Sequence, residues 1–269
     1  MVAAVRRKFN NEMVWFFRNY FRGWNAFEIT LLILSFVLPI TLGVVFEAGV
    51  IDIAASVVAC VAAVFFAKAK IEAYFLSFLM AVFYSISMFG LGLYGEVLIQ
   101  LAIVFPLELF GVICWFRSRK KGKGKTIEIK RTSNREITLL VLSQVVMGVG
   151  YFYLLRAFGT AELIVSTIAV VTAVIGNYLM ARRSHFGTGG LLLNSMSQVA
   201  LASIMVSHGF TAAVPMLVMA IMFCVIDFYG MFNWARLRRR QLADKKLLRA
   251  KGQLTPLYLE NQTKPELVS

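Results

Sequence analysis

The sequence predicts an all-α polytopic membrane protein, with eight transmembrane helices arranged as two parallel repeats. Its 269 residues are 59% hydrophobic and only 16% charged, whereas soluble domains are about half apolar and about a quarter charged. A soluble fold of this size has too little interior to cover so much apolar surface. Three further observations support the prediction: long apolar runs, basic residues gathered between alternate runs, and similarity between the two halves of the chain.

The apolar runs have the length of membrane-spanning helices. About 20 mostly apolar residues are needed to cross a hydrocarbon core about 30 Å thick. Eight runs meet this requirement, at residues 27–47, 50–67, 71–90, 93–116, 136–158, 161–181, 190–207 and 211–235. A transmembrane barrel would instead show alternating segments of about ten residues, and the sequence has none.

The charges between the runs set the orientation. Basic residues gather in the N-terminal segment, near Lys68 and Lys70, in the 117–135 loop, at Arg182 and Arg183, and after residue 235. The connections between these hold acidic residues or no charge. Cytoplasmic loops are rich in lysine and arginine, so eight spans with both termini in the cytoplasm satisfy this rule throughout. We therefore expect a multi-pass protein of the bacterial inner (plasma) membrane, with the basic blocks serving orientation rather than nucleic-acid binding.

Three segments lie outside the predicted spans. Residues 1–26 are basic and aromatic, a mixture that favours a helix in the membrane interface. Residues 117–135 form a basic cytoplasmic loop. Residues 236–269 form a polar cytoplasmic tail, whose composition predicts disorder from residue 241 onward.

The two halves, residues 27–116 and 136–235, resemble each other. EITLLILS at 28–35 recurs as EITLLVLS at 136–143, and the fourth span of each half ends in a Gly-x-x-x-Trp pattern. Each copy holds four spans, an even number, so both copies enter the membrane in the same direction. The pattern predicts a parallel repeat related by an axis along the membrane normal, with substrate bound between the units.

Glu108 and Asp227 are equivalent under this repeat, since a shift of 119 residues carries one onto the other. Both lie seven residues before the tryptophan of the pattern, which places them about 10 Å into the membrane at the rise of an α-helix. An ionisable group there is costly if it faces lipid. We expect the two acids to face the partner unit or water and to bind substrate; the alternative is a protonated carboxyl bonded to a neighbouring helix.

Other polar side chains are predicted to line the same site. They are Gln100, Asn194, Gln198, Tyr84, Ser166, Thr167 and Tyr229. An amide has four hydrogen-bonding positions to satisfy, which favours a binding role for the three amides. Serine and threonine in membrane helices more often join helices together. Interfacial anchoring is the alternative for Tyr229 and the expected role of Trp115 and Trp234. The three cysteines lie in apolar runs without metal-ligand spacing, so we expect neither a metal nor a cofactor.

The chain contains three short motifs: LYGEVLIQ at 93–100, PLELFG at 106–111 followed by Trp115, and Tyr229-Gly230 followed by Trp234. These motifs resemble those of the PnuC family of nicotinamide riboside transporters. The resemblance implies a SWEET-like fold, in which two three-helix bundles are joined by a linking helix, here with an extra N-terminal span, often as a homotrimer. It also implies uptake of a vitamin precursor by facilitated diffusion, with nicotinamide riboside as the leading substrate and thiamine, riboflavin or deoxynucleosides as alternatives.

The chain departs from this family at the predicted site. The family usually has a neutral amide at Glu108, commonly an asparagine near Asp227, and an aspartate at Ser166. Two carboxylates suit a cationic ring such as a pyridinium, and equally suit proton coupling. An integral-membrane enzyme is the distant alternative, because the only two histidines, His185 and His208, are predicted on opposite sides of the membrane. A scaffolding protein would have no reason to keep paired acids in the membrane.

Overall fold

The computed structural model describes residues 21, 23–90, 97, 100–121, 127–159, 162–209 and 213–250. Within these ranges all regular structure is helical, apart from an isolated β-bridge between Lys130 and Ser184. The predicted interfacial segment lies almost entirely outside the described residues. So do the start of the fourth predicted span, except Val97, and the last part of the C-terminal tail.

The helices follow the predicted runs closely. The first half contains α2 (Ala26–Val45), α3 (Val50–Ala67), α4 (Glu72–Gly90), the π-helix η1 (Gln100–Val104) and α6 (Phe105–Lys121). The second half contains α7 (Asn134–Ala157), α8 (Leu163–Ala181), α9 (Gly187–Ser207) and α10 (Val214–Ala250).

Seven helices in the described part of the chain are long and apolar enough to cross a membrane. The third predicted run forms α4, whose apolar portion Glu72–Ile86 is shorter than the other seven. The prediction of an all-α protein with several membrane-spanning helices is therefore confirmed, and the count of eight spans stays a prediction.

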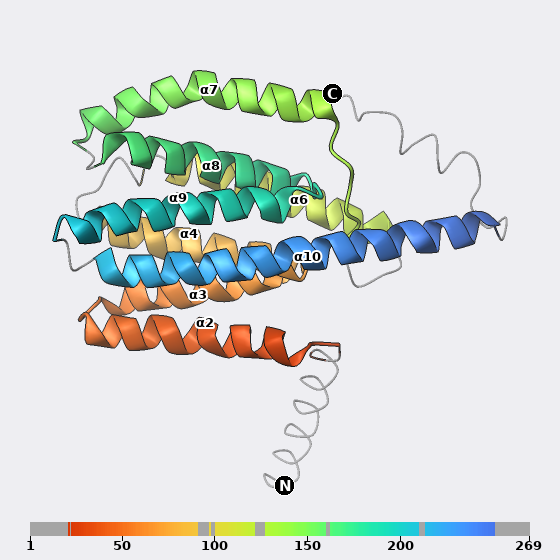
Figure 1. The fold of residues 1–269 in the computed structure, drawn as a ribbon, viewed down its shortest axis with the longest axis horizontal. Coiled ribbons are helices and arrows are strands. Elements are labelled where there is room, and N and C mark those ends of the chain that lie inside the picture. The colour runs from red at the N-terminus through yellow and green to blue at the C-terminus, as the bar shows by residue number, and fades with distance from the viewer. Residues whose placement is uncertain are drawn as a thin grey trace, which may run out of the picture.

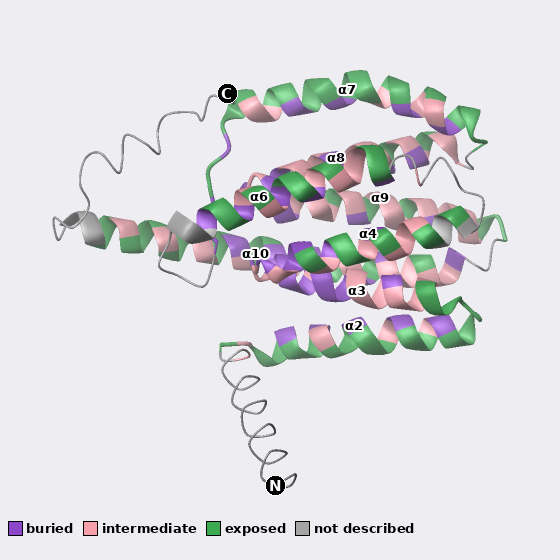
Figure 2. Ribbon diagram, turned by 180° about the vertical axis from the view of Figure 1, so that it is seen from behind, coloured by how far each residue is buried: buried purple, intermediate pink, exposed green. Residues whose placement is uncertain are grey.

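The two halves meet along α3 and α10 and along α6 and α8, with smaller contacts of α10 with α2 and of η1 with α8. Within the halves, α3 packs on α4 and α9 packs on both α8 and α10. Between the halves, α10 packs on α3 while α6 packs on α8. The flanking helices α2 and α7 pack on α3 and α8 and lie at opposite edges of the bundle (Figure 1). These edge helices are mostly exposed along their length (Figure 2), as expected for apolar helices that face lipid.

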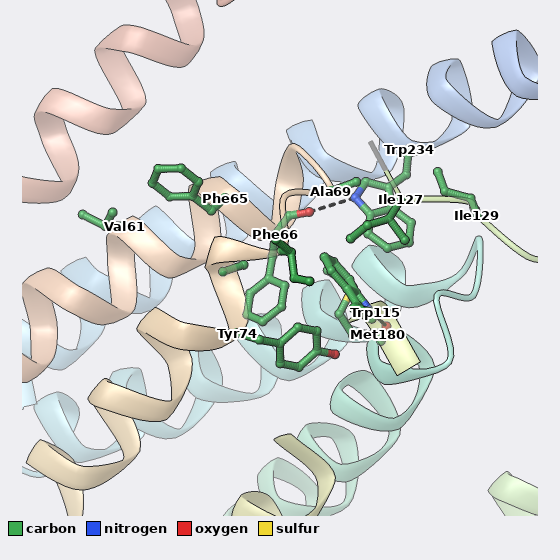
Figure 3. Close-up of a cluster of buried hydrophobic side chains, with 12 residues drawn as sticks. Val61, Phe65, Phe66, Ala69, Tyr74, Trp115, Ile127, Ile129, Met180 and Trp234 are labelled. Carbon is green, nitrogen blue, oxygen red and sulfur yellow. Dashed lines mark hydrogen bonds between the residues drawn. The ribbon is translucent and has the colours of Figure 1, made fainter. Parts of the chain in front are cut away.

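The largest buried cluster lies at one end of the bundle, which we call the tryptophan end because Trp115 and Trp234 lie there. Both side chains are 0% exposed. The expectation that they anchor the protein at the membrane interface is therefore wrong. Their indoles lie inside the protein because the two halves close on each other at this end (Figure 3).

The tryptophan end also carries a strap formed by residues 127–132. The main-chain N–H of Lys130 donates to the carbonyl of Arg183 over 2.9 Å, and the N–H of His185 donates to the carbonyl of Lys130 over 3.1 Å. Ile127 and Ile129 are buried in the same cluster as the tryptophans. The middle of the predicted basic loop is therefore an ordered part of the core.

The C-terminal helix is longer than the sequence analysis predicted. Disorder was expected from residue 241, but α10 continues to Ala250 and projects beyond the other helices (Figure 1). Residues 236–250 contain neither glycine nor proline and consist mainly of strong helix formers. The strap also holds this extension: the side-chain amide of Gln241 donates to the Ile127 carbonyl over 2.8 Å and accepts from the Ile129 N–H over 3.0 Å.

The glutamate of the repeated EITLL motif has the same structural role in both halves. Glu28 accepts a hydrogen bond from Lys68, the residue that caps α3, over 2.5 Å. Glu136 accepts one from Arg182, the residue that caps α8, over 2.8 Å. Each motif therefore fixes a flanking helix, α2 or α7, to the end of the helix beside it.

Candidate substrate site

Glu108 lies in the first turn of α6 and is 2% exposed. Its Oε1 accepts a hydrogen bond from the hydroxyl of Ser77 in α4. Its other oxygen, Oε2, is buried without a hydrogen-bond partner. A buried carboxyl oxygen without a partner is energetically costly, which marks this position as one that a ligand, a water molecule or a proton would stabilise.

Asp227 in α10 repeats this arrangement in the second half. It is 5% exposed, and its Oδ2 accepts a hydrogen bond from the hydroxyl of Ser195 in α9 over 2.6 Å. The two serines were not singled out from the sequence. A signal was present, because a shift of 118 residues carries Ser77 onto Ser195, one residue different from the shift that relates the acids.

The hydrogen bonds of the two acids differ from the expected direction. The sequence analysis placed both acids toward the partner unit or water, whereas each recorded side-chain bond runs to a helix of the same half. Neither acid is turned toward lipid, because both are buried. The carboxylates therefore join helices within each half, and Glu108 keeps one oxygen unpartnered.

Gln100 is the first residue of η1 and is 8% exposed, with its Nε2 buried and unpartnered. The π-helix lies just before Pro106, which has no N–H to donate to the preceding turn. This segment packs on α4 of its own half and on α8 of the other. Gln100 thus lies where the halves meet, and π-helical turns are frequent at functional sites.

Asn194 and Gln198 are one turn apart in α9, so they lie on the same face of that helix. Both are half-buried. The Oδ1 of Asn194 is shielded from solvent and has no partner. Since Asn194 directly precedes Ser195, this unpartnered amide oxygen lies at the level of the bond between Ser195 and Asp227.

Four predicted site residues remain, and one of them, Tyr229, lies away from the acids. Tyr84 in α4 is half-buried, and Ser166 in α8 is buried. The Thr167 hydroxyl donates to the Leu163 carbonyl of its own helix over 2.7 Å, which is the bond expected of a threonine in a membrane helix. Tyr229 is not brought to the acids, because its hydroxyl donates to Glu28 of α2.

The predicted site residues are therefore mainly carboxylates and amides that are buried or half-buried. Three of them have unpartnered polar atoms: Gln100 Nε2, Glu108 Oε2 and Asn194 Oδ1. In the part of the chain that the structure describes, no group of three or more His, Cys, Asp or Glu residues is placed to hold a metal ion. Such an arrangement can bind a polar or charged small molecule inside an apolar bundle.

Comparison with known proteins decides between the classes of function. The family model described as nicotinamide mononucleotide transporter matches residues 49–236. The chain belongs to the nicotinamide mononucleotide transporter family. This is the PnuC family that the short motifs resemble, so the protein is a membrane transporter and not an enzyme.

Two relatives place this member of the family more closely. The chain is 24% identical over 234 residues to the nicotinamide riboside transporter PnuC of Neisseria mucosa, an alignment that covers 85% of this chain and 88% of the relative. Its fold is similar to the crystal structure of the vitamin B3 transporter PnuC, with a TM-score of 0.69, 24% identity, and coverage of 84% of this chain and 98% of the other. The fold of the family thus extends over most of this transporter.

Proposed function

We propose that this family member takes up nicotinamide riboside by facilitated diffusion, with alternating access between two parallel helix bundles. The observation that carries the proposal is the matched pair of buried carboxylates, Glu108 and Asp227, each held by a serine and accompanied by unpartnered amide atoms. Thiamine, riboflavin and deoxynucleosides are the alternative substrates.

The packing supports a parallel SWEET-like repeat. The contact of α10 with α3 has its counterpart in the contact of α6 with α8. Helices α3 and α8 both end at the tryptophan end, where the two Gly-x-x-x-Trp patterns also lie. In this arrangement α4 crosses the membrane as an eighth span, α7 links two three-helix bundles, and α2 is an extra N-terminal span.

Charge favours the riboside over the mononucleotide. Nicotinamide riboside carries a positive pyridinium ring, whereas the mononucleotide adds a phosphate. The sequence has no lysine or arginine between residues 71 and 116 or between residues 184 and 235. A phosphate at the level of the two acids would therefore meet carboxylates without a compensating cation, and burial of an unpaired charge is strongly unfavourable.

Each side chain in the proposed site has a role that fits its chemistry. Glu108 and Asp227 supply negative charge or accept hydrogen bonds from the ligand. The amides of Gln100, Asn194 and Gln198 bind the ribose hydroxyls or the carboxamide, while the Tyr84 ring stacks on the pyridinium. Ser166 and Thr167 line the wall on the α8 side. Tyr229 is left out of the binding set because its hydroxyl is bound to Glu28.

The basic residues support an orientation. We place the tryptophan end in the cytoplasm, because Lys68, Arg182, the strap and the α10 extension lie there and cytoplasmic segments are rich in lysine and arginine. Both termini are then cytoplasmic, in a bacterial inner membrane. The family resemblance favours a homotrimer, which native mass spectrometry of the purified protein will test.

Uptake by reconstituted vesicles tests the substrate. We expect saturable entry of labelled nicotinamide riboside, with weaker entry of thiamine, riboflavin, deoxynucleosides and nicotinamide mononucleotide. The variant E108Q should lower the affinity for the cationic riboside about tenfold, since it removes one charge–charge contact in a site shielded from water. T172V, which alters a half-buried hydroxyl that bonds within α8 and to Ser197, is the control. Unchanged riboside affinity in E108Q would refute the role of Glu108.

Proton coupling is the second candidate, and the unpartnered Oε2 of Glu108 favours it. A carboxyl that gains and loses a proton during each cycle would make uptake depend on a pH gradient. Riboside accumulation above the external concentration, driven by an imposed gradient and lost in E108Q, would establish coupling. Equilibration to equal concentrations inside and outside would establish facilitated diffusion.

A further inference from the structure

Trp115 and Trp234 occupy equivalent positions of the repeat and tie the two halves together reciprocally. The indole N–H of Trp115 in α6 donates to the main-chain carbonyl of Met180 in α8 over 3.0 Å. The indole N–H of Trp234 in α10 donates to the carbonyl of Phe66 in α3 over 2.9 Å, as the dashed line in Figure 3 shows. Each half thus holds the end of a helix from the other half.

The accepting carbonyls also lie in equivalent surroundings. Phe66 and Met180 belong to the last turns of α3 and α8. In each case the residue after the helix cap has the left-handed conformation, Ala69 (φ 54°) or Arg183 (φ 57°). The accompanying main-chain bonds run from Lys70 to Phe65 over 3.0 Å and from Ser184 to Leu179 over 2.8 Å. Both helix ends therefore have the Schellman geometry, and their last carbonyls, at the negative end of the helix dipole, are good acceptors.

Apolar packing closes the same place. The two indole rings lie with their centroids 6.1 Å apart, and neither side chain is exposed. Ile127 and Ile129 of the strap belong to the same buried cluster. The strap is joined by main-chain bonds to the turn that follows α8. A third bond joins the halves here, from the side-chain amide of Asn233 in α10 to the Ala67 carbonyl of α3 over 2.9 Å. The halves are therefore sealed at the tryptophan end by the two indole side chains, these hydrogen bonds and a covering segment.

Transport through the middle of the bundle requires this seal to open. A ligand held at the level of Glu108 and Asp227 lies about two helical turns above the tryptophans, so it can leave toward this end only when the halves part there. We propose that Trp115 and Trp234 form the gate at the tryptophan end, with both indole hydrogen bonds broken and remade in each transport cycle. This inference rests on the alternating-access mechanism proposed above.

A reversible crosslink between the halves tests the gate. A Cβ atom at Gly230 of α10 would lie 3.1 Å from the Cβ of Ala67 in α3, slightly closer than the separation of about 3.5–4.5 Å in disulfides. In a chain with Cys60, Cys114 and Cys224 replaced by alanine, the pair A67C/G230C should transport when reduced. Oxidation should reduce uptake to the background of empty vesicles, and a reductant should restore it.

A crosslink within one half is the matched control. A Cβ at Gly43 of α2 would lie 3.5 Å from the Cβ of Ile53 in α3, so G43C/I53C joins two helices of the same half. Its oxidation should leave uptake unchanged. Mass spectrometry measures the fraction of A67C/G230C that contains the disulfide. Undiminished uptake by the disulfide-bonded protein would overturn the gate proposal.

A labelling experiment keeps the test independent of transport. Thr188 is 0% exposed and lies against Gly230. The variant T188C, in the same cysteine-free background, should react slowly with an impermeant maleimide from the tryptophan side. Adding W115F and W234F replaces each indole with a smaller phenyl ring and removes both N–H donors, so labelling should accelerate about tenfold as the open state becomes more populated. Equal labelling rates would overturn the gate, whereas absence of riboside binding by the unmodified protein would refute the proposed substrate and leave the labelling result valid.

Discussion

The two repeated glutamates provide a test of how burial sets the strength of an ion pair. Glu28 and Lys68 form a pair whose side chains are 4% and 11% exposed, and Glu28 also accepts bonds from the Tyr229 hydroxyl and the Asn25 N–H. Glu136 and Arg182 occupy the corresponding positions with side chains 25% and 35% exposed. We predict that E28Q destabilises the protein much more than E136Q does.

The magnitude follows from the partner that each substitution leaves behind. Removing one member of a buried ion pair costs about 3–5 kcal/mol, because the remaining charge is uncompensated. A pair near the surface contributes at most about 1 kcal/mol. At about 2–4 °C for each kcal/mol in a chain of this size, the melting temperature should fall by roughly 10 °C in E28Q and by roughly 2 °C in E136Q.

Thermal unfolding of the purified protein in one detergent, followed by tryptophan fluorescence, measures both values. The double variant E28Q/K68M removes both charges and keeps an acceptor for Tyr229 and Asn25. It should recover most of the loss seen in E28Q, because no uncompensated charge remains. Equal decreases for E28Q and E136Q, or no recovery in E28Q/K68M, would refute the assignment of Glu28 as a member of a buried pair.

Three further predictions concern the acids and the tryptophan end. Replacing the hydroxyl donor to Asp227 with S195A should weaken riboside binding several-fold, because a charge-assisted bond that positions the carboxylate is lost. The control is S197A, whose hydroxyl bonds to the Leu193 carbonyl and the Thr172 hydroxyl and to neither acid, and it should bind as the unmodified protein does. The variant Q241A should speed hydrogen exchange of the Ile129 amide about tenfold, because it removes the acceptor of that N–H. K245M should speed this exchange less, because the Lys245–Glu128 pair is more exposed. An unchanged exchange rate of the Ile129 amide in Q241A would contradict the role of Gln241. Burial and the nearby charges of Arg238 and Arg131 lower the pKa of His185. The unfolded chain therefore binds the proton more tightly, and folding stability should fall as the pH drops below about 6.5. The variant H185Q should reduce this pH dependence of the melting temperature between pH 7.5 and 5, and an unchanged slope would show that His185 is not its source.

The helices and the two acids were predictable because each depends on a local pattern. A run of about 20 apolar residues has one stable conformation in lipid, so the helix positions follow from composition. Glu108 and Asp227 could be found because alignment of the two repeats places them at equivalent positions. The hydroxyl partners Ser77 and Ser195 were missed, since serine in a membrane helix is common and their shift differs by one residue from that of the acids.

The tryptophan end could not be predicted, because it depends on contacts between distant segments. A tryptophan next to a basic block favours the membrane interface, and only the approach of α6 to α8 and of α10 to α3 buries Trp115 and Trp234. The ordered strap depends on Gln241, which is more than 100 residues away in the sequence. Polar composition predicted disorder for a segment that distant contacts hold in a helix.

The positions of the acids and of the tryptophans together explain how one motion could serve both binding and release. Each acid is bonded to a helix of its own half, so a half can move as a unit without breaking those bonds. Each tryptophan is bonded to the opposite half, so its bond must break when the halves rotate apart. If the two halves were inverted relative to each other, the ends of α3 and α8 would lie at opposite ends of the bundle. The two tryptophan bonds could then not both form at one end. The proposed rocking of two like-oriented halves would therefore open the tryptophan end and preserve the bonds that hold the carboxylates in place.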